Sequence, residues 1–346
     1  MISATEGFIN QSERYSSNNA GKSLKKYTLL KKGELAYNHG YSKTRNFGSC
    51  FTLEIEQARI PFVYHSFSLK GENDSVFWGK YLNSGLFDGK LRRLVASTAR
   101  MDGLLNISFE NYSSMPVNIP SLPEQKKIAA FFTLLDRCIQ KQRQLVECLK
   151  TYKRGVLQSV FSKNYKWEEL SIEDIFSCII DKNHPDKTVL TIVQGTGTLP
   201  RNSIDRKISY NAESVSSYKK VKENDFILHL RSFEGGLEIA NEEGIVSPAY
   251  TILRATKNIS PLFYYNYFRS YNFINEKLRI AVEGIRDGKS INMNTFWKIK
   301  VPFPPYELQN YYASFFSLID KNIKKNESLL QALEKGKRQL LQKMFI

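Results

Sequence analysis

Residues 120–161 read PSLPEQKKIAAFFTLLDRCIQKQRQLVECLKTYKRGVLQSVF, and the stretch returns at residues 304–345 as PPYELQNYYASFFSLIDKNIKKNESLLQALEKGKRQLLQKMF. The two align without a gap at a constant separation, as Asp136 and Asp320 show (320 − 136 = 184). Further matches are Pro120 with Pro304, Gln125 with Gln309, Phe131-Phe132 with Phe315-Phe316, Ile139 with Ile323, Leu149 with Leu333, Lys153-Arg154 with Lys337-Arg338, Gln158 with Gln342 and Phe161 with Phe345. Chance would not sustain this match, so the chain contains an internal duplication.

Each copy predicts one long helix, over residues 123–161 and 306–345. Apolar side chains recur at steps of three and four, and Pro120 and Pro123 lie just ahead, where proline suits a helix start. The stripes are Ile128, Phe131, Phe132, Leu135, Ile139, Leu145, Leu149 and Val156, and then Tyr312, Phe315, Phe316, Ile319, Ile323, Leu329, Leu333 and Leu340. At about 1.5 Å per residue, the first helix would span roughly 55 Å.

Two such stripes must bury their apolar faces, and the simplest arrangement pairs the helices with each other, antiparallel, about a pseudo-twofold axis. We expect the pair to be held by Ile128, Phe132, Leu135, Ile139, Leu149, Phe316, Ile319, Ile323 and Leu333. The alternative is that each helix packs only on its own domain, because the width of a stripe does not identify its partner. Basic residues such as Lys141 and Arg143 would line the exposed face, which is either solvated or turned toward phosphates or an acidic partner.

The segments around the helices lack helical periodicity and predict α+β domains. Short strands are expected at Phe51–Ile55, Val189–Val193, Phe226–Leu230 and Tyr250–Leu253, and a short helix at Leu262–Leu278. We therefore predict an α+β fold with two similar α/β domains, each followed by a long helix. The expected boundaries are 1–120 and 164–303 for the domains and 121–163 and 304–346 for the helices.

The two domains are similar but unequally complete. Residues Tyr27–Leu35 resemble Tyr218–Phe226 in sequence. The second domain begins near Trp167, far ahead of Tyr218, whereas only 26 residues precede Tyr27. We therefore expect the first domain to be incomplete at its N-terminal edge.

The charge balance favours a polyanionic partner. Lys and Arg total 50 against 34 Asp and Glu, a net charge of +16, and such an excess attracts nucleic acid by counterion release. Basic residues lie among Asn, Gln, Ser and Tyr in the predicted loops, where Lys and Arg neutralise phosphates and Arg, Asn and Gln pair with base edges. The candidates are Lys25, Lys26, Lys43, Arg45, Arg92, Arg93, Arg201, Lys207, Lys219, Lys220, Arg231, Arg286 and Lys289. The alternative is a merely basic, solvated surface.

Motifs in both copies carry a family resemblance. Asn106–Tyr112 precedes Val117–Ile128, followed by Leu134-Leu-Asp136 and Leu149–Gln158. The second copy has Ile291-Asn-Met-Asn-Thr-Phe, then Ile299–Gln309 and Leu341–Phe345. A Pro…Glu-Gln pattern followed by Asp and a Lys/Arg-Gly…Leu-Gln ending, occurring twice, resembles the specificity subunit of type I restriction-modification systems.

The resemblance implies two target-recognition domains, each reading one half of a split site in double-stranded DNA, and two helices that set their separation as an antiparallel coiled coil. It further implies that DNA methyltransferase subunits dock on the conserved regions, that restriction/translocase subunits complete the enzyme, and that this subunit has no active site. Two departures are the incomplete first domain and Leu308, which directly precedes Gln309 where the first copy has Glu124.

The sequence offers no persuasive catalytic site. Phe303 stands where an amino-methyltransferase motif ahead of Pro304-Pro305-Tyr306 would need a polar residue, so these prolines are better read as a helix start. Gly195-Thr-Gly197 lacks the remaining features of a dinucleotide or phosphate loop, and Glu124-Gln-Lys126 has no paired aspartate for a nuclease metal site. We expect no catalytic residue, metal or cofactor.

Four cysteines without metal-ligand spacing, four scattered histidines and no apolar stretch of membrane-spanning length favour a cytoplasmic protein with no membrane partner. The alternative function is a truncated or spare recognition cassette that acts as a protein-interaction module without DNA binding of its own.

Overall fold

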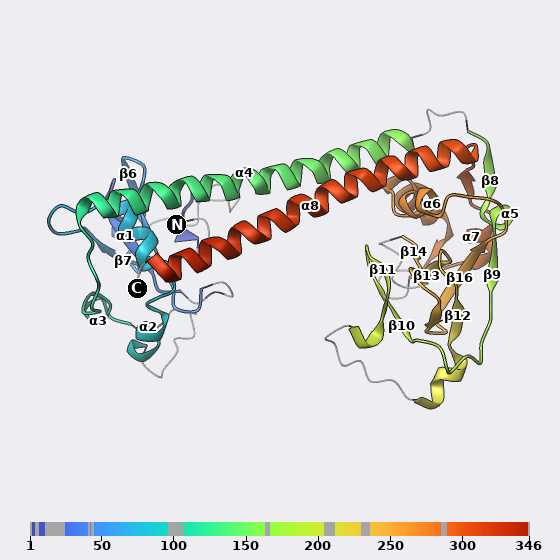
Figure 1. Ribbon diagram of the computed structural model, residues 1–346, viewed down its shortest axis with the longest axis horizontal. Coiled ribbons are helices and arrows are strands. Elements are labelled where there is room, and N and C mark those ends of the chain that lie inside the picture. The colour runs from blue at the N-terminus through green and yellow to red at the C-terminus, as the bar shows by residue number, and fades with distance from the viewer. Residues whose placement is uncertain are drawn as a thin grey trace. The chain divides into compact units, whose positions relative to one another are not determined.

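The structure is a computed structural model that describes residues 2–3, 7–10, 25–40, 42, 45–95, 105, 107–162, 167–203, 212–229, 236–284 and 289–344. Two compact units make up the chain: unit 1 comprises Met1–Gln144 with Asn326–Ile346, and unit 2 comprises Leu145–Lys325. Helices α4 (Leu122–Val160) and α8 (Tyr306–Met344), each of 39 residues, both contribute to each unit (Figure 1).

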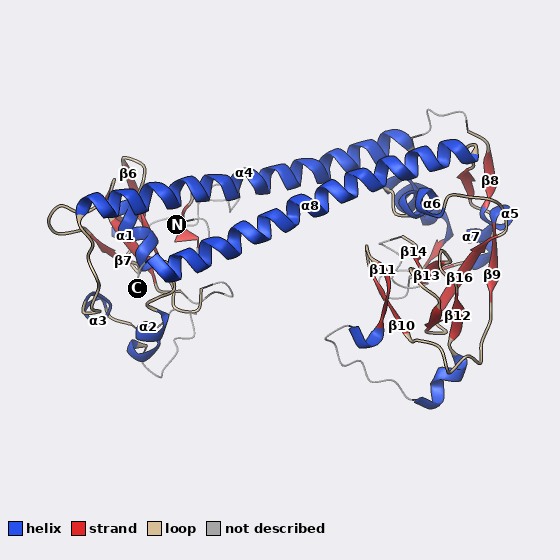
Figure 2. Ribbon diagram, in the orientation of Figure 1, coloured by secondary structure: helices blue, strands red, loops and turns tan. Residues whose placement is uncertain are grey.

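Unit 1 combines small antiparallel sheets with short helices (Figure 2). Its strands are β1 (Ile2–Ser3) with β2 (Gly7–Phe8), β3 (Thr28–Lys31) with β6 (Gln57–Ile60), and a three-stranded sheet of β5 (Ser49–Thr52), β4 (Leu35–Asn38) and β7 (His65–Phe67), with β4 central. Its short helices are α1 (Ser75–Leu82), α2 (Asp88–Leu94) and α3 (Phe109–Ser113). The core joins β4 and α1 to both long helices through side chains that include Leu35, Phe77, Phe132 and Leu341.

Unit 2 has the larger sheet, in the order β14 (Glu238–Ile239), β13 (Phe226–His229), β16 (Tyr250–Ala255) and β9 (Phe176–Ile179). Two-stranded pairs are β8 (Glu169–Ser171) with β19 (Lys300–Pro302), β10 (Leu190–Val193) with β11 (Gly197–Pro200), β12 (Lys219–Val221) with β15 (Gly244–Val246), and β17 (Val282–Glu283) with β18 (Ser290–Ile291). Its α-helices, besides its parts of α4 and α8, are α5 (Ile172–Ile175), α6 (Pro261–Phe268) and α7 (Met293–Trp297).

The core of unit 2 is rich in aromatic rings. Phe226, Phe263, Phe268 and Phe316 are fully buried, and Phe161 at the end of α4 packs against Phe263 with ring centroids 5.4 Å apart. Aromatic side chains bury large apolar areas, so the sheet, α6 and the two long helices form one core in this unit.

The same turn precedes an inner strand of the main sheet in each unit, β4 in unit 1 and β13 in unit 2. Gly33 and Asn224 both have a left-handed backbone, with φ of 86° and 70°. The amide of Gly33 donates to the Leu53 carbonyl, and that of Asn224 to the Ala240 carbonyl, both at 2.8 Å. Glycine and asparagine tolerate this conformation better than other residues. The similarity between Tyr27–Leu35 and Tyr218–Phe226 therefore reflects one turn used twice.

The predicted elements agree with the structure except in three places. The long helices lie within two residues of their expected bounds, and a mixture of helix and sheet is confirmed. The strand expected at Phe51–Ile55 is β5, which begins at Ser49 and ends at Thr52. The helix expected over Leu262–Leu278 is interrupted, since α6 ends at Phe268 and a π-helix follows at Asn272–Lys277. Buried Ser270 accepts from the Phe273 amide at 3.2 Å, which redirects the chain between them.

The third difference concerns the apolar stripes. Phe131, Leu145 and Leu329 were expected on the buried faces, but they are 44%, 44% and 48% exposed. Phe132, next to Phe131, and Val146, next to Leu145, are buried. Residues 132, 139 and 146 are spaced seven apart, so they lie on one face of the helix, and this is the face that is buried.

Candidate functional site

Two buried glutamines join the long helices to the rest of their units. In unit 1, the Gln125 Oε1 accepts from the Asp74 amide at the start of α1 (2.9 Å), and its Nε2 donates to the Pro120 carbonyl (3.0 Å). In unit 2, the Gln309 Oε1 accepts from the Ser260 amide at the start of α6 (2.9 Å), and its Nε2 donates to the Pro304 carbonyl (2.8 Å). The glutamine of the duplicated motif therefore satisfies a backbone group at the start of a second helix in each unit.

Sequence reasoning found these glutamines only as matching positions and assigned them no role. Gln125 and Gln309 are 1% and 0% exposed, and a polar side chain is rarely buried unless it is hydrogen-bonded. Their recurrence at the 184-residue separation was the signal that marked them.

In unit 1, α4 and α8 contact each other through polar side chains. Asp136 on α4 binds Lys337 on α8 at 2.5 Å and Lys80 on α1 at 2.7 Å, and the Gln142 Nε2 donates to the Asn326 Oδ1 at 2.9 Å. Arg143 and Glu334 form a further ion pair at 2.5 Å, with the Arg side chain 62% exposed. Residue numbers rise along α4 from 136 to 143 while their ion-pair partners fall from 337 to 334, so the helices run antiparallel here.

In unit 2, the same two helices meet again. Lys153 on α4 binds Asp320 on α8 at 2.6 Å. Because Asp320 is the counterpart of Asp136, and Lys153 of Lys337, one Asp–Lys pair occurs twice, once in each unit. Of the expected helix-pair residues, Phe132, Ile139, Phe316, Ile319 and Ile323 are buried, and Ile128, Leu135, Leu149 and Leu333 are half-buried.

The charge of Asp136 gives unit 1 a pH-dependent contribution to stability. Burial raises the pKa of Asp136, but hydrogen bonds and the charges of Lys337 and Lys80 outweigh burial and hold that pKa below its ordinary value. A lowered carboxyl pKa stabilises the folded state above the unfolded pKa of about 3.9, and the stabilisation is lost as the pH falls through the folded pKa.

Asp136→Asn is expected to lower the free energy of unfolding by about 0.5–1 kcal/mol at pH 7, a small effect because the Asp136 side chain is 37% exposed and solvent screens the pair. The difference from the parent should vanish below the folded pKa, as measured by urea unfolding at a series of pH values. Glu147→Gln, which removes an exposed charge 3.6 Å from Lys150, is the control and should have almost no effect. An Asp136→Asn penalty that is constant with pH would contradict this explanation.

Several of the expected DNA-contacting residues in unit 1 lie on or beside α2. Arg92 and Arg93 are exposed on this helix. Arg45 lies close to Asp88, the first residue of α2: burial lowers the pKa of Arg45, and Asp88 opposes that effect. We call Arg45, Arg92 and Arg93 the α2 basic group. Lys25 and Lys26 are exposed just ahead of β3, and Lys43 lies outside the described residues.

In unit 2, several expected DNA-contacting residues have partners in the protein. The Lys219 Nζ donates to the Tyr250 carbonyl at 2.6 Å, and burial lowers the pKa of Lys219. Lys220 lies 3.7 Å from Glu243, and the Arg201 Nε donates to the Thr191 Oγ1 at 3.4 Å. Lys289 is exposed, and Lys207, Arg231 and Arg286 lie outside the described residues.

Two cation–carboxylate contacts in unit 2 were not anticipated. Arg254 donates to both oxygens of Asp225, which is buried, at 2.8 and 2.6 Å. Arg269 lies 3.6 Å from buried Glu238 and 2.8 Å from the Tyr265 hydroxyl. Buried carboxylates need partners, so these arginines support the fold.

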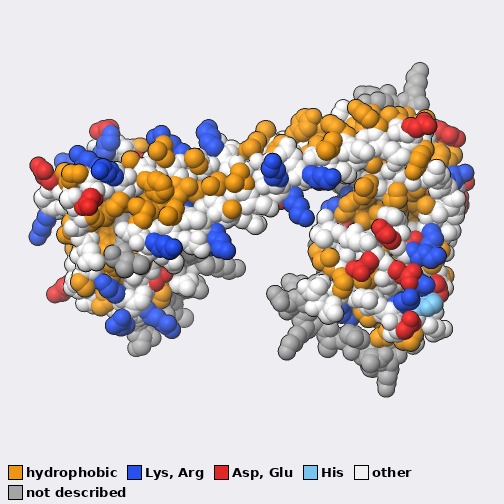
Figure 3. Space-filling model, in the orientation of Figure 1, with side chains coloured by type: hydrophobic (Ala, Val, Ile, Leu, Met, Phe, Trp, Pro, Cys, Tyr) orange, Lys and Arg blue, Asp and Glu red, His pale blue; other side chains and the backbone are white. Residues whose placement is uncertain are grey.

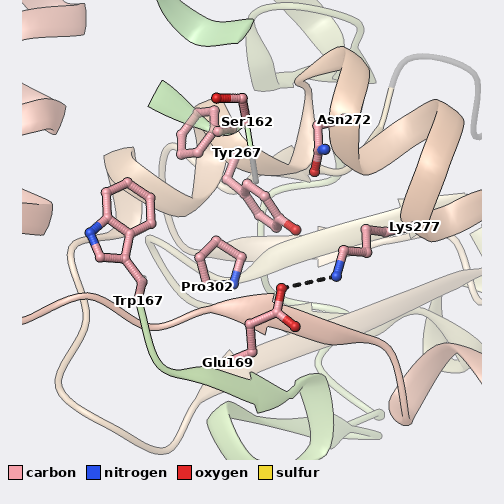
Figure 4. Close-up of a pocket in the computed structure, with 8 residues that line it drawn as sticks. Ser162, Trp167, Glu169, Tyr267, Asn272, Lys277 and Pro302 are labelled. Atoms are coloured by element: carbon pink, nitrogen blue, oxygen red, sulfur yellow. Dashed lines mark hydrogen bonds and ion pairs between the residues drawn. The ribbon is translucent and has the colours of Figure 1, made fainter. Parts of the chain in front are cut away.

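A cavity of about 320 Å³ lies at the end of α4 in unit 2 (Figure 4). Trp167, Glu169, Tyr267 and Lys277 line it, and Glu169 and Lys277 form an ion pair at 3.0 Å across it. Each charge therefore has its partner within the protein, and the pair resembles a structural contact more than a catalytic one. In the described parts of the chain, no cluster of three or more His, Cys, Asp or Glu side chains is arranged to hold a metal ion.

Comparison with known proteins bears on the resemblance. No family model matches the chain. A curated relative from Methanocaldococcus jannaschii, the "Putative type I restriction enzyme MjaX specificity subunit", is 23% identical over an alignment that covers 92% of this chain and 78% of that protein. Among the helices that the structure describes, none combines the length and hydropathy of a membrane span.

Solved structures share the fold along most of the chain. The HsdS subunit from Thermoanaerobacter tengcongensis matches with a TM-score of 0.51 and 15% identity over 92% of this chain and 81% of that one. The S subunit of a type I restriction-modification system from M. genitalium gives 0.53 and 15% over 93% and 85%. A structure reported for complex assembly and conformational transition of the type I R-M system gives 0.58 and 13% over 92% and 83%. The curated relative therefore confirms the resemblance to type I specificity subunits, and the HsdS structures show that the fold is shared over nine-tenths of the chain.

Proposed function

We propose that this chain is the specificity subunit of a type I restriction-modification complex, which binds a bipartite site in double-stranded DNA and catalyses no reaction itself. The observation that carries the proposal is the duplicated anchor: Gln125 and Gln309 attach a long helix in the same way to two similar units. A protein that reads two half-sites needs two readers with a fixed spacing, and duplication of reader and helix would supply both. The homology to specificity subunits supports the same role.

Residues 1–120 and 164–303 are the proposed recognition domains, and residues 121–163 and 304–346 are the proposed spacer helices. The spacer would be an antiparallel coiled coil of α4 and α8. The Asp136–Lys337 and Lys153–Asp320 pairs support it, because they repeat one contact in opposite directions along the two helices. Linking two weak readers in this way increases affinity through effective concentration.

For DNA contact in unit 1, the α2 basic group is the favoured surface. Arg92 and Arg93 present exposed guanidinium groups on one short helix, and Arg45 lies beside its first residue. Guanidinium groups bind phosphates and pair with guanine in the major groove. Lys219 and Lys220 are weaker candidates in unit 2, because a carbonyl and a carboxylate already hold their ammonium groups.

Replacing Arg92 and Arg93 together by alanine is expected to reduce the slope of log K against log salt by about 2, because each phosphate contact contributes about 1. DNA affinity of the assembled complex would be measured by fluorescence anisotropy over a salt series. Lys321→Ala with Lys324→Ala removes the same charge from exposed positions on α8 and should leave the slope nearly unchanged. An unaltered slope in the arginine variant would remove the α2 basic group from the interface.

The long helices also offer apolar positions for a protein partner. Leu134 and Leu318, which are counterparts in the duplication, are 60% and 64% exposed, and Figure 3 shows hydrophobic side chains at the surface over α4. A contiguous exposed apolar patch is typical of an interaction site, and Phe131, one helical turn before Leu134, is also 44% exposed. We assign these two positions to DNA methyltransferase subunits, one at each copy; a restriction/translocase subunit would complete the assembly.

Leu134→Asp with Leu318→Asp is expected to abolish co-purification with a co-expressed type I DNA methyltransferase subunit, while thermal unfolding of the chain changes little. A charge at the centre of an interface is costly, whereas a charge on an already exposed position is not. Gln144→Asp with Gln331→Asp, both exposed on the same helices, is the control. Retained co-purification in the leucine variant would place docking elsewhere. A complex that forms but methylates no DNA would instead favour an interaction module without sequence recognition.

A further inference from the structure

In unit 2, residues 167–179 cover one side of the domain. This covering segment consists of β8, α5 and β9, and it extends two different parts of the unit: β8 pairs with β19, and β9 pairs with β16. Its side chains Ile172 and Ile175 are 0% exposed and Phe176 is 2% exposed. The segment therefore supplies both backbone pairing and core to unit 2.

Backbone hydrogen bonds show which residues receive the covering segment. The Ile172 amide donates to the Ile299 carbonyl at 3.0 Å, and the Phe303 amide donates to the Glu168 carbonyl at 2.7 Å. On the sheet, the Thr256 amide donates to the Ile175 carbonyl at 2.8 Å. The receiving backbone is therefore 299–303, ahead of α8, and 252–256 on and after β16.

Unit 1 contains the counterparts of both receiving stretches. The 184-residue separation equates 299–303 with 115–119. In unit 1 Leu35 pairs with Phe67, and in unit 2 its counterpart Phe226 pairs with Leu253. Phe67 is therefore the counterpart of Leu253, and residues 66–70 are the counterparts of residues 252–256. We call residues 66–70 and 115–119 the open edge. In the part of unit 1 that the structure describes, no strand pairs with β7 on the side away from β4, and residues 115–119 form no strand.

Exposure along the open edge agrees with a missing partner. Ile119 is 62% exposed, whereas its counterpart Phe303 packs against the core of unit 2. Phe67 and Val117 are half-buried, whereas their counterparts Leu253 and Val301 are 0% exposed. Apolar side chains that are buried in one copy of a fold and exposed in the other mark a surface with an absent partner.

A cavity lies at the same place in unit 1. It measures about 460 Å³, and Tyr81, Asn118, Ile119 and Met344 are among the residues that line it. In unit 2 the cavity of about 320 Å³ is lined by Tyr267 and Pro302 (Figure 4). Pro302 is the counterpart of Asn118 at the 184-residue separation, and Tyr267 is that of Tyr81 at the separation that relates Phe67 to Leu253 (253 − 67 = 267 − 81 = 186). Two members of the covering segment, Trp167 and Glu169, line this cavity as well.

We propose that the open edge of unit 1 binds an extended peptide segment with the pattern Trp-x-x-Leu-x-Ile-x-x-Ile-Phe, as residues 167–176 provide in unit 2. Main-chain pairing with an exposed sheet edge gives such a segment affinity, and pockets for alternate side chains give it specificity. Charge is consistent with the same occupant: residues 167–176 contain four acidic side chains, Glu168, Glu169, Glu173 and Asp174, while Lys70 lies on the edge and Lys127 lines the cavity. Glu124 also lines that cavity, but its carboxylate accepts hydrogen bonds from the Ser121 amide and hydroxyl. Residues 11–24 contain only Tyr15, Ala20 and Leu24 as apolar side chains and do not match the pattern.

The probe is a synthetic peptide of residues 167–179, titrated into the full chain by isothermal calorimetry. We expect one peptide to bind per chain and hydrogen exchange to slow at the amides of residues 66–70 and 115–119. A peptide with Ile172→Asp and Ile175→Asp is the matched control and should not bind, because both side chains enter the core.

Two variants of the chain locate the site. Ile119→Asp is expected to weaken peptide binding by at least about tenfold without unfolding unit 1, because Ile119 is exposed in the free chain. Ile180→Asp, at a 70% exposed position of unit 2, should leave binding unchanged.

Three results would overturn the proposal. The first is no binding of the peptide at millimolar concentration. The second is altered exchange confined to residues 252–256 and 299–303, which would mean that the peptide competes with the covering segment in unit 2. The third is a dimer of the chain that the peptide dissociates, which would make a second copy the occupant. Peptide binding at the open edge does not depend on DNA binding. A finding that the chain does not recognise DNA would therefore not contradict this proposal.

Discussion

Replacing Phe316 by alanine is expected to lower the free energy of unfolding of unit 2 by about 3–5 kcal/mol. Phe316 is 0% exposed on α8, and its ring lies 5.9 Å from that of Phe161 at the end of α4 and 6.3 Å from that of Tyr312. Removing it leaves a cavity where α4, α8 and the core of unit 2 meet, and surrounding side chains relax only partly into such a space. The change would be followed by tryptophan fluorescence, to which unit 2 contributes Trp167, packed against Tyr312, and Trp297.

The matched control is Leu318→Ala, two positions along the same helix. Leu318 is 64% exposed, so its truncation removes little buried surface and should change the unfolding free energy by about 0.5 kcal/mol or less. Equal losses in the two variants would show that Phe316 does not hold the helix to the domain. The pair also separates stability from docking, because Leu318 is a proposed partner contact and Phe316 is not.

Sequence alone predicted the elements with long, regular patterns. The two helices were found because a stripe over ten turns outweighs local exceptions, and the duplication was found because it has no gap. The pattern could not distinguish Phe131 from Phe132, because adjacent apolar residues fit the same step of three or four and only the packed domain selects one of them. Leu145 failed in the same way beside Val146.

The contacts of the candidate site residues could not be predicted from the sequence. Residue type identified basic side chains, but it could not show that Lys219 is held by the Tyr250 carbonyl or that Asp225 engages Arg254, since these partners are brought together only by strand pairing. The roles of Gln125 and Gln309 were hidden for a similar reason. Each reaches the start of another helix, 51 and 49 residues away in sequence, which no local pattern encodes.

Gln309→Leu is expected to lower the free energy of unfolding of unit 2 by about 2–4 kcal/mol, although leucine is similar in size and would remain buried. The substitution leaves the Ser260 amide and the Pro304 carbonyl without the partner that the glutamine provides, and each buried, unsatisfied group costs about 1–3 kcal/mol. Urea unfolding of parent and variant measures the loss.

The same change at Gln331, which is exposed on α8, is the control and should alter stability by about 0.5 kcal/mol or less. Gln125→Leu should reproduce the loss in unit 1, because the Asp74 amide and the Pro120 carbonyl depend on Gln125 in the same way. A Gln309→Leu variant as stable as the Gln331→Leu control would mean that water or a shifted backbone satisfies both groups. The duplicated glutamine would then be a by-product of the repeat, and the helices would be held to their domains by apolar contacts such as those of Phe132 and Phe316 alone.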